Sequence, residues 1–201
     1  MNLIFFLMML FTCIDAEELS IIDKLSDQKG FEFNFVQKKY YKFLKEPKIS
    51  NGHAIYSHSG NFIWETTGTN AGKIISNGKN VWIYTPAEEE GDVPVVHISQ
   101  ASKLKGVGSF VMSGQYKVSD LKESNKAGYK ELKINGAKDK GYEWAKLSFD
   151  DRTDFRLDSI EFEDIDSSKV LIEIKDFKKL KSRLSPKLFT FKPPKGARII
   201  R

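Results

Sequence analysis

Hydrophobic and polar residues alternate with a period of two along much of this chain. Phe31, Phe33 and Phe35 alternate with Glu32 and Asn34, a pattern typical of a strand with one buried face. Similar short strands are predicted at 74–75, 81–84 and 93–98, around Ala145, Leu147 and Phe149, and around Val170, Ile172 and Ile174. At a spacing of roughly 8–14 residues this pattern predicts about ten antiparallel strands, arranged as a sandwich or a barrel.

Turn signals and short helical patterns punctuate the predicted strands. Residues 17–29 have apolar positions at helical spacing and acidic residues in the first turn, so we expect one amphipathic helix that ends at Gly30. Residues 101–113 are loosely helical, and residues 186–188 form a turn or a short helical patch. Hairpin turns are predicted at Asn51-Gly52, Asn77-Gly78, Asn135-Gly136 and Lys140-Gly141.

The first sixteen residues do not fit this folded domain. An apolar run from Leu3 to Phe11 is too short to span a bilayer but fits the hydrophobic region of a secretory signal, with Ala16 at the cleavage position. A lipoprotein signal that acylates Cys13 is the rival interpretation, although Phe11 stands where small residues are favoured. We therefore predict a signal peptide at 1–16 and a single domain at 17–201, exported and free of cysteine.

The sequence contains little that could support catalysis. The single Cys lies in the predicted signal, and the three His are scattered. The Gly68-Thr69-Asn70-Ala71-Gly72-Lys73 stretch departs from the phosphate-binding loop in spacing and lacks the following Ser or Thr, so it predicts a plain turn. Residues 150–154 lack the glycine and the final acid of a calcium loop and also predict a turn. We expect no enzyme, no metal and no cofactor.

Charge is concentrated at the C-terminal end. Residues 175–201 carry ten Lys or Arg and one acid, a net charge of +9, in a chain whose total is +5. This region is either a solvated basic edge or a surface that contacts an anionic membrane or an acidic partner. We expect no nucleic acid as a ligand because the predicted protein is exported.

Aromatic residues make up 12% of the chain, and 15 of them are Phe. Most stand on alternating positions that point into a core. They either pack that core or line an apolar cavity, and a cavity with few polar groups would suit acyl chains. The candidate lining residues are Phe33, Phe35, Phe62, Trp64, Trp82, Tyr84, Phe110 and Trp144.

Three stretches in this order resemble the periplasmic outer-membrane lipoprotein carrier family, LolA. The first is Phe35-Val36-Gln37-Lys38, which is similar to an early Phe-x-Gln element of that family. The second is the block at 52–86, with Phe62-Ile63-Trp64-Glu65 and the run from Ile75 to Pro86. The third is the stretch at 189–197, which resembles a C-terminal Phe-x-Phe-x-Pro-Pro-x-Gly-Val signature. The resemblance spans roughly 19–200.

The resemblance implies a mainly β fold, a half-open antiparallel barrel of about 10–11 strands closed by a lid of short helices. It implies a monomeric periplasmic chaperone that shields the acyl chains of lipoproteins. Its partners would be acylated lipoproteins, an inner-membrane ATP-driven release complex, and an outer-membrane receptor or the outer membrane itself.

The resemblance also assigns roles to individual residues. Phe62 matches a position at the cavity mouth, and Trp64, Trp82 and Tyr84 match apolar strand positions of the same block. His58 stands where the family usually has an arginine that latches the barrel to the lid. An imidazole has fewer hydrogen-bond donors than a guanidinium and is mostly neutral at pH 7.

Two other functions remain open on the sequence. One is an acylated outer-membrane receptor of similar fold, which would require a lipid on Cys13. The other is a sensor or envelope-binding module on the same half-barrel, because fold does not fix function.

Overall fold

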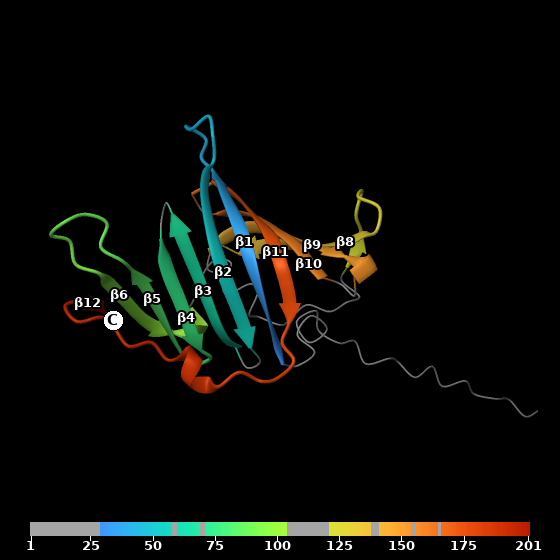
Figure 1. Ribbon diagram of the computed structural model, residues 1–201. Helices are drawn as coiled ribbons and strands as arrows, with labels where there is room; N and C mark the ends of the chain where they lie inside the picture. The colour runs from blue at the N-terminus through green and yellow to red at the C-terminus, as the bar shows by residue number, and fades with distance from the viewer. Residues whose placement is uncertain are drawn as a thin grey trace, which may run out of the picture.

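The computed structural model describes residues 29–57, 60–68, 71–103, 121–137, 141–153, 156–164 and 166–201. Within these ranges the chain is mainly β, as predicted (Figure 1). The strands are β1 (Gly30–Tyr40), β2 (Lys48–Ser57), β3 (Asn61–Gly68), β4 (Gly72–Asn77), β5 (Asn80–Thr85), β6 (Val95–Gln100), β7 (Lys122–Glu123), β8 (Tyr129–Ala137), β9 (Tyr142–Asp150), β10 (Arg156–Asp164), β11 (Lys169–Lys179) and β12 (Arg198–Ile200). Three short 3₁₀ helices are η2 (Ala101–Lys103), η5 (Asp151–Thr153) and η6 (Pro186–Phe189).

All twelve of these strands belong to one open sheet. Their order is β12-β6-β5-β4-β3-β2-β1-β11-β10-β9-β8-β7, so β1 and β11 join an N-terminal half to a C-terminal half. The described strand pairs are antiparallel except β12 with β6, which run parallel. The prediction of a half-open, mainly antiparallel barrel is therefore confirmed, with a short added strand at each edge. Of the helices expected at 17–29 and 101–113, only Lys29 and η2 lie within the described residues.

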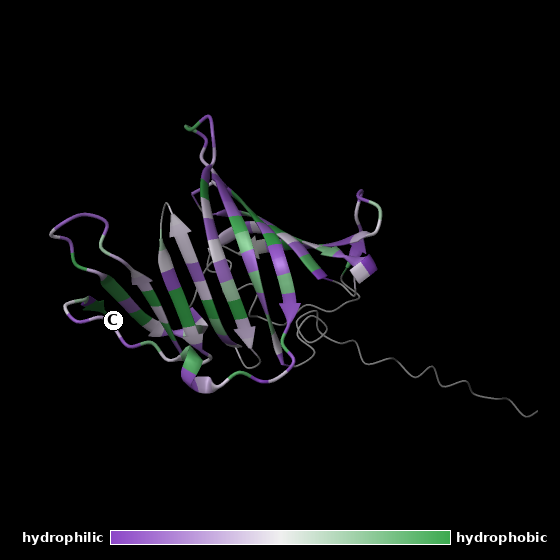
Figure 2. Cartoon of the chain, in the orientation of Figure 1, coloured by the Kyte–Doolittle hydropathy of each residue, from purple (hydrophilic) through white to green (hydrophobic). Residues whose placement is uncertain are grey.

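One face of the sheet, which we name the aromatic face, carries the main core. Phe33 pairs with Ala54, Ala54 with Trp64, and Trp64 with Ile74, so these side chains point to the same side. The face continues across β11, β10 and β9 through Ile172, Ile160 and Leu147. The alternation of green and purple along the strands in Figure 2 reflects this division into an apolar and a more polar side.

The opposite side of β2–β5, the outer face, has a smaller core of its own. Ile63 and Ile75 pack with Phe189 of η6, and the side chain of Phe189 is fully buried. Residues 180–197, which we name the C-terminal segment, run past this face and lead into β12 (Figure 1). Gly196 has a φ of +84°, and Ala197 donates a backbone hydrogen bond to Pro194, which turns the chain toward its pairing with β6.

The predicted turns have mixed outcomes. Asn77-Gly78 does form the hairpin between β4 and β5, and Asn77 Oδ1 accepts hydrogen bonds from the backbone of Lys79 and Asn80. Asn51-Gly52 and Asn135-Gly136 are not turns, because they lie inside β2 and β8. Gly141 has a φ of +81° just before β9, and residues 186–188 form part of η6, as expected.

Gly52 is required in its strand for a packing reason. A Cβ atom at this position would lie 2.1 Å from Cζ of Phe35 and 2.4 Å from the backbone oxygen of Glu65. The ring of Phe35 therefore covers the glycine, and only a hydrogen atom fits beneath it.

Candidate functional site

A cluster of stacked aromatic rings occupies the part of the aromatic face formed by β1, β2 and β3. The rings of Phe35 and Trp64 stack with centroids 4.1 Å apart, and Phe33 meets Trp64 edge-on at 6.1 Å. Phe31 stacks on Tyr56 at 4.9 Å. These separations are those of favourable aromatic pairs, so the rings form one continuous apolar surface.

A β-bulge adds one more ring to this cluster. The pairing of β1 with β11 shifts register between Glu32 and Asn34, opposite Asp176, whose φ of +50° is unusual for a residue other than glycine. The bulge turns Phe177 onto the aromatic face, where it lies 5.5 Å from Phe31 and 6.3 Å from Phe33. Asp176 in turn accepts a hydrogen bond from the side chain of Asn34 at 2.9 Å.

The sequence did not indicate Phe177 or Tyr56 as members of this cluster. Strict alternation from Val170, Ile172 and Ile174 places Phe177 on the opposite side, and only the bulge reverses it. Tyr56 lies in β2, for which no separate strand was predicted. The alternation of Ala54 and Tyr56 with the residues between them was the signal available for it.

The cluster is made of Phe, Tyr and Trp rings and contains no carboxylate, amine, guanidinium or imidazole group. The buried core to which it belongs consists of Phe, Ala, Tyr, Leu, Ile and Val side chains. Phe33 and Phe35 are each 2% exposed, whereas Trp64 is only partly buried. Trp64 is thus the ring of the predicted set on this face that is most accessible to a ligand.

The structure brings together four of the predicted lining residues. Phe33, Phe35, Phe62 and Trp64 all lie on the aromatic face, and Phe62 pairs with Tyr56. Phe62 is only 5% exposed, so it is a core residue of this face in the structure.

The sheet separates three others from this group. Trp82 pairs with Ile75 on the outer face, and Tyr84 lies 5.6 Å from Phe191 of the C-terminal segment. Trp144 alternates with the core residue Ala145, and its indole nitrogen donates a hydrogen bond to Glu163 at 2.7 Å. These three cannot line one surface with Trp64. The remaining predicted residues, Phe110 and His58, lie outside the described residues.

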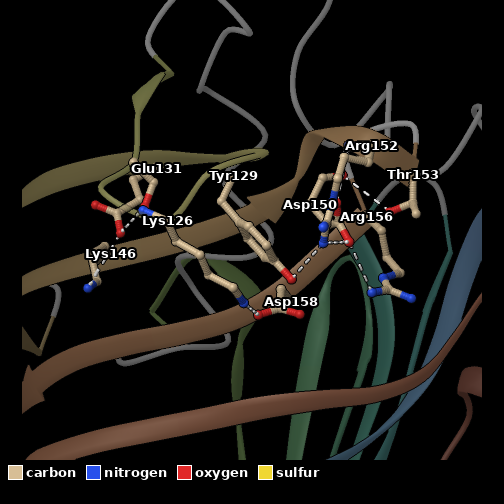
Figure 3. Close-up of polar contacts among 10 residues, drawn as sticks. Lys126, Tyr129, Glu131, Lys146, Asp150, Arg152, Thr153, Arg156 and Asp158 are labelled. Atoms are coloured by element: carbon tan, nitrogen blue, oxygen red, sulfur yellow. Dashed lines mark hydrogen bonds and ion pairs between the residues drawn. The ribbon is translucent and has the colours of Figure 1, made fainter.

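Polar contacts gather elsewhere, at the end of β9 (Figure 3). Asp150 is 3% exposed and accepts hydrogen bonds from Nε and Nη2 of Arg152, at 2.9 and 3.1 Å. Arg156 lies 3.4 Å away. The hydrogen bonds from Arg152 hold the pKa of Asp150 below its ordinary value, although burial opposes this.

This polar network is structural. Arg152 also donates to the hydroxyl of Tyr129 at 3.3 Å, so the turn at 150–153 is tied to β8. Where a turn was predicted, residues 151–153 form η5 after the end of β9. Across the described ranges no group of three or more His, Cys, Asp or Glu is placed to hold a metal ion. Nor does any described helix have the length and apolar character needed to cross a membrane.

These observations define an open β-sheet protein with a cluster of aromatic rings on one face. A family model described as outer membrane lipoprotein carrier protein LolA matches residues 26–192. The chain belongs to this family, as the resemblance of its motifs predicted.

Individual relatives agree with this assignment. An outer-membrane lipoprotein carrier protein of Legionella pneumophila (strain Corby) is 28% identical over the full length of both chains. One of Aeromonas salmonicida (strain A449) is 32% identical over 71 residues, which cover 35% of each chain. A solved structure of an uncharacterized conserved protein from Thermus thermophilus shares the fold. Its TM-score is 0.52 at 11% identity, and the match covers 89% of this chain and 95% of that one.

Proposed function

We propose that this protein is a periplasmic carrier that shelters the acyl chains of lipoproteins against its aromatic face. The observation that carries the proposal is the uncharged ring cluster of Phe33, Phe35 and Trp64 on one face of an open sheet. Membership of the lipoprotein carrier family supports it.

The physical need for such a carrier follows from the cost of exposing lipid to water. Each methylene group moved from a bilayer to water costs about 0.8 kcal/mol, so a multiply acylated protein does not leave a membrane unaided. Aromatic rings offer a large apolar area with few rotatable bonds. Rings that do not match the acyl chain atom for atom still shelter it, and the loose fit keeps release possible.

The carrier would work between two membranes and catalyse no reaction. An inner-membrane ATP-driven complex would supply the energy for loading, and an outer-membrane receptor or the outer membrane itself would take up the cargo. The chain would then need neither a nucleotide nor another cofactor, and it would act as a monomer.

The three tryptophans allow a direct test of which face binds cargo. We would prepare the mature protein with Trp64 as its only tryptophan, by Trp82→Phe and Trp144→Phe, and a second protein that keeps only Trp82. An acylated lipoprotein should shift the emission of Trp64 to shorter wavelength and leave that of Trp82 unchanged, because the two residues lie on opposite faces. The same lipoprotein without its acyl chains is the control ligand. A shift of Trp82 alone, or an equal response to both ligands, would contradict the proposal.

Export and the lid latch remain proposals from the sequence. We propose that residues 1–16 are removed as a signal peptide, so that protein recovered from the periplasm begins at Glu17. N-terminal sequencing tests this, and a lipid on Cys13 would contradict it. We also propose that His58 serves as the latch and that Phe110 joins the acyl-binding residues.

A further inference from the structure

The loop between β1 and β2 extends beyond the end of the sheet (Figure 1). We name residues 40–49, which include this loop and the strand ends that lead into it, the hairpin tip. Its sequence is Tyr-Tyr-Lys-Phe-Leu-Lys-Glu-Pro-Lys-Ile. Apolar side chains alternate here with lysines, and the function proposed above does not use them.

The apolar side chains of the hairpin tip are unusually exposed. Phe43 is 82% exposed, the highest value among the large hydrophobic side chains exposed in the described part of the chain. Tyr40, Leu44 and Ile49 are also exposed. The ring of Tyr41 lies 5.5 Å from that of Phe43, and a backbone hydrogen bond from Leu44 to Tyr41 closes the turn that presents them. A folded protein gains nothing by holding this cluster in water.

The lysines of the hairpin tip leave it positively charged. Lys42, Lys45 and Lys48 outnumber Glu46, giving a net charge of +2. Lys39, just before the tip, is instead neutralised by Asp164 and Asp166 at 3.2 and 3.3 Å. Lys48 lies over the ring of Tyr41 at 5.6 Å, so its charge stays close to the apolar cluster.

We propose that the hairpin tip docks on the surface of an anionic lipid bilayer. Phe43 and Leu44 enter the headgroup region while Lys42, Lys45 and Lys48 contact lipid phosphates. Aromatic side chains and lysines, whose long stems are apolar, both favour the membrane interface. Anionic lipid complements the positive charge. The docking does not depend on cargo, so it can fail or succeed independently of the carrier function.

Strand β1 connects the hairpin tip directly with the ring cluster of the aromatic face. Phe35 of the aromatic face and Tyr40 of the hairpin tip are five residues apart on one strand, about 17 Å at the rise of an extended strand. A bilayer held at the tip is therefore within reach of an acyl chain that leaves or enters the ring cluster.

An acidic loop at the same end of the sheet should determine how the protein is oriented on the bilayer. The loop between β5 and β6 carries Glu88, Glu89, Glu90 and Asp92, which an anionic surface repels. It lies four strand spacings from the hairpin tip, roughly 19 Å across the sheet. That distance exceeds the screening length of about 8 Å at physiological salt, so the tip can dock while the acidic loop stays clear.

Vesicle flotation with the full mature chain tests this docking. Wild-type protein should bind vesicles of phosphatidylcholine mixed with phosphatidylglycerol and should bind pure phosphatidylcholine weakly. Raised salt should weaken the binding. Phe43→Trp should show quenching by lipids brominated near the headgroup. Failure of the wild-type protein to bind the anionic vesicles would overturn the proposal and would favour a protein partner for the tip.

Matched variants locate the binding surface. Phe43→Ser with Leu44→Ser should reduce binding at least tenfold because both apolar anchors are lost. Lys42→Gln with Lys45→Gln should reduce binding about fivefold for each charge removed. The controls are Val93→Ser, an exposed apolar site on the acidic loop, and Lys181→Gln with Arg183→Gln in the C-terminal segment. All these sites are exposed, and circular dichroism verifies that each variant is folded. Unchanged binding by the Phe43 and Leu44 variant, or equal loss in the controls, would overturn the proposal.

Discussion

Several single residues in this molecule owe their identity, conformation or charge to the side chains that pack against them. Gly52 lies under the ring of Phe35, and Asp176 adopts a positive φ so that Phe177 can reach the ring cluster. Asp150 remains charged although it is buried, because Arg152 donates two side-chain hydrogen bonds to it. Gly52 and Asp176 help to shape the aromatic face, and Asp150 stabilises the C-terminal half of the sheet.

Gly52→Ala should destabilise the protein although it adds a single methyl group. The new Cβ would collide with Phe35 and with the backbone of Glu65, so either the ring or the strand must move. We expect a loss of about 1–3 kcal/mol in the free energy of unfolding, measured by urea denaturation. The control is Asn51→Ala at the exposed neighbouring position, for which we expect a change within about 0.5 kcal/mol. Equal stability of the two variants would contradict the close packing of Phe35.

Asp150→Asn should destabilise the protein in a pH-dependent way. The folded state lowers the pKa of Asp150, so its stabilising effect is complete above the ordinary carboxyl pKa of about 4. The effect is lost as pH falls through the lower folded value. The difference between wild type and variant in the free energy of unfolding should therefore be largest at neutral pH and shrink in acid. Asp151→Asn, whose partner Lys130 lies 3.6 Å away, is the control. A difference that persists unchanged in strong acid would rule out this charge effect.

Strands were predictable here where alternation was regular, and turns where the surrounding alternation stopped. The pattern around Phe31, Phe33 and Phe35 predicted β1 because consecutive side chains of a strand point to opposite faces. Asn77-Gly78 is flanked by two strands and forms their turn. Asn51-Gly52 carries the same signal, yet it lies inside β2, paired with β1 and β3, where the glycine leaves room for Phe35. A dipeptide cannot reveal a ring that approaches from another strand.

The candidate site was predictable in composition but only partly in position. Phe33, Phe35, Phe62 and Trp64 lie together because their alternation and pairing agree. Trp82 was grouped with them because it matches an apolar strand position of the family block, but it lies on the outer side of β5, which the C-terminal segment covers. The C-terminal segment and β5 are about a hundred residues apart in the sequence. The periodicity within a strand cannot predict a contact between them.

The C-terminal segment should act as a clamp on the outer face. Phe189 is fully buried between β3 and β4, so Phe189→Ala leaves a cavity in the smaller core. We expect a loss of about 3–5 kcal/mol in the free energy of unfolding. Faster proteolysis of residues 180–201 should accompany it. Leu188→Ala, at an exposed neighbouring position, should change little. Equal effects of the two substitutions would show that the segment is not held by Phe189.

At the scale of the whole molecule, two surfaces have different physical requirements. The ring cluster on the aromatic face consists of aromatic side chains that are largely buried, whereas the hairpin tip is exposed and carries a net charge of +2. Apolar association is insensitive to screening, while docking on an anionic bilayer relies on charge. If both proposals hold, raised salt should leave cargo binding largely unchanged and should weaken contact with the membrane.

Paired measurements should therefore separate the two surfaces. Binding of an acylated lipoprotein should be unaffected by raised salt and should show a negative heat-capacity change in calorimetry, because apolar area is buried. Vesicle binding by the empty protein should weaken under the same conditions. Trp64→Ser should weaken cargo binding and leave vesicle binding intact, since Trp64 lies on the aromatic face. Phe43→Ser with Leu44→Ser should do the reverse. If either variant impaired both activities equally while remaining folded, cargo and membrane would share one surface, and the division between face and tip would be wrong.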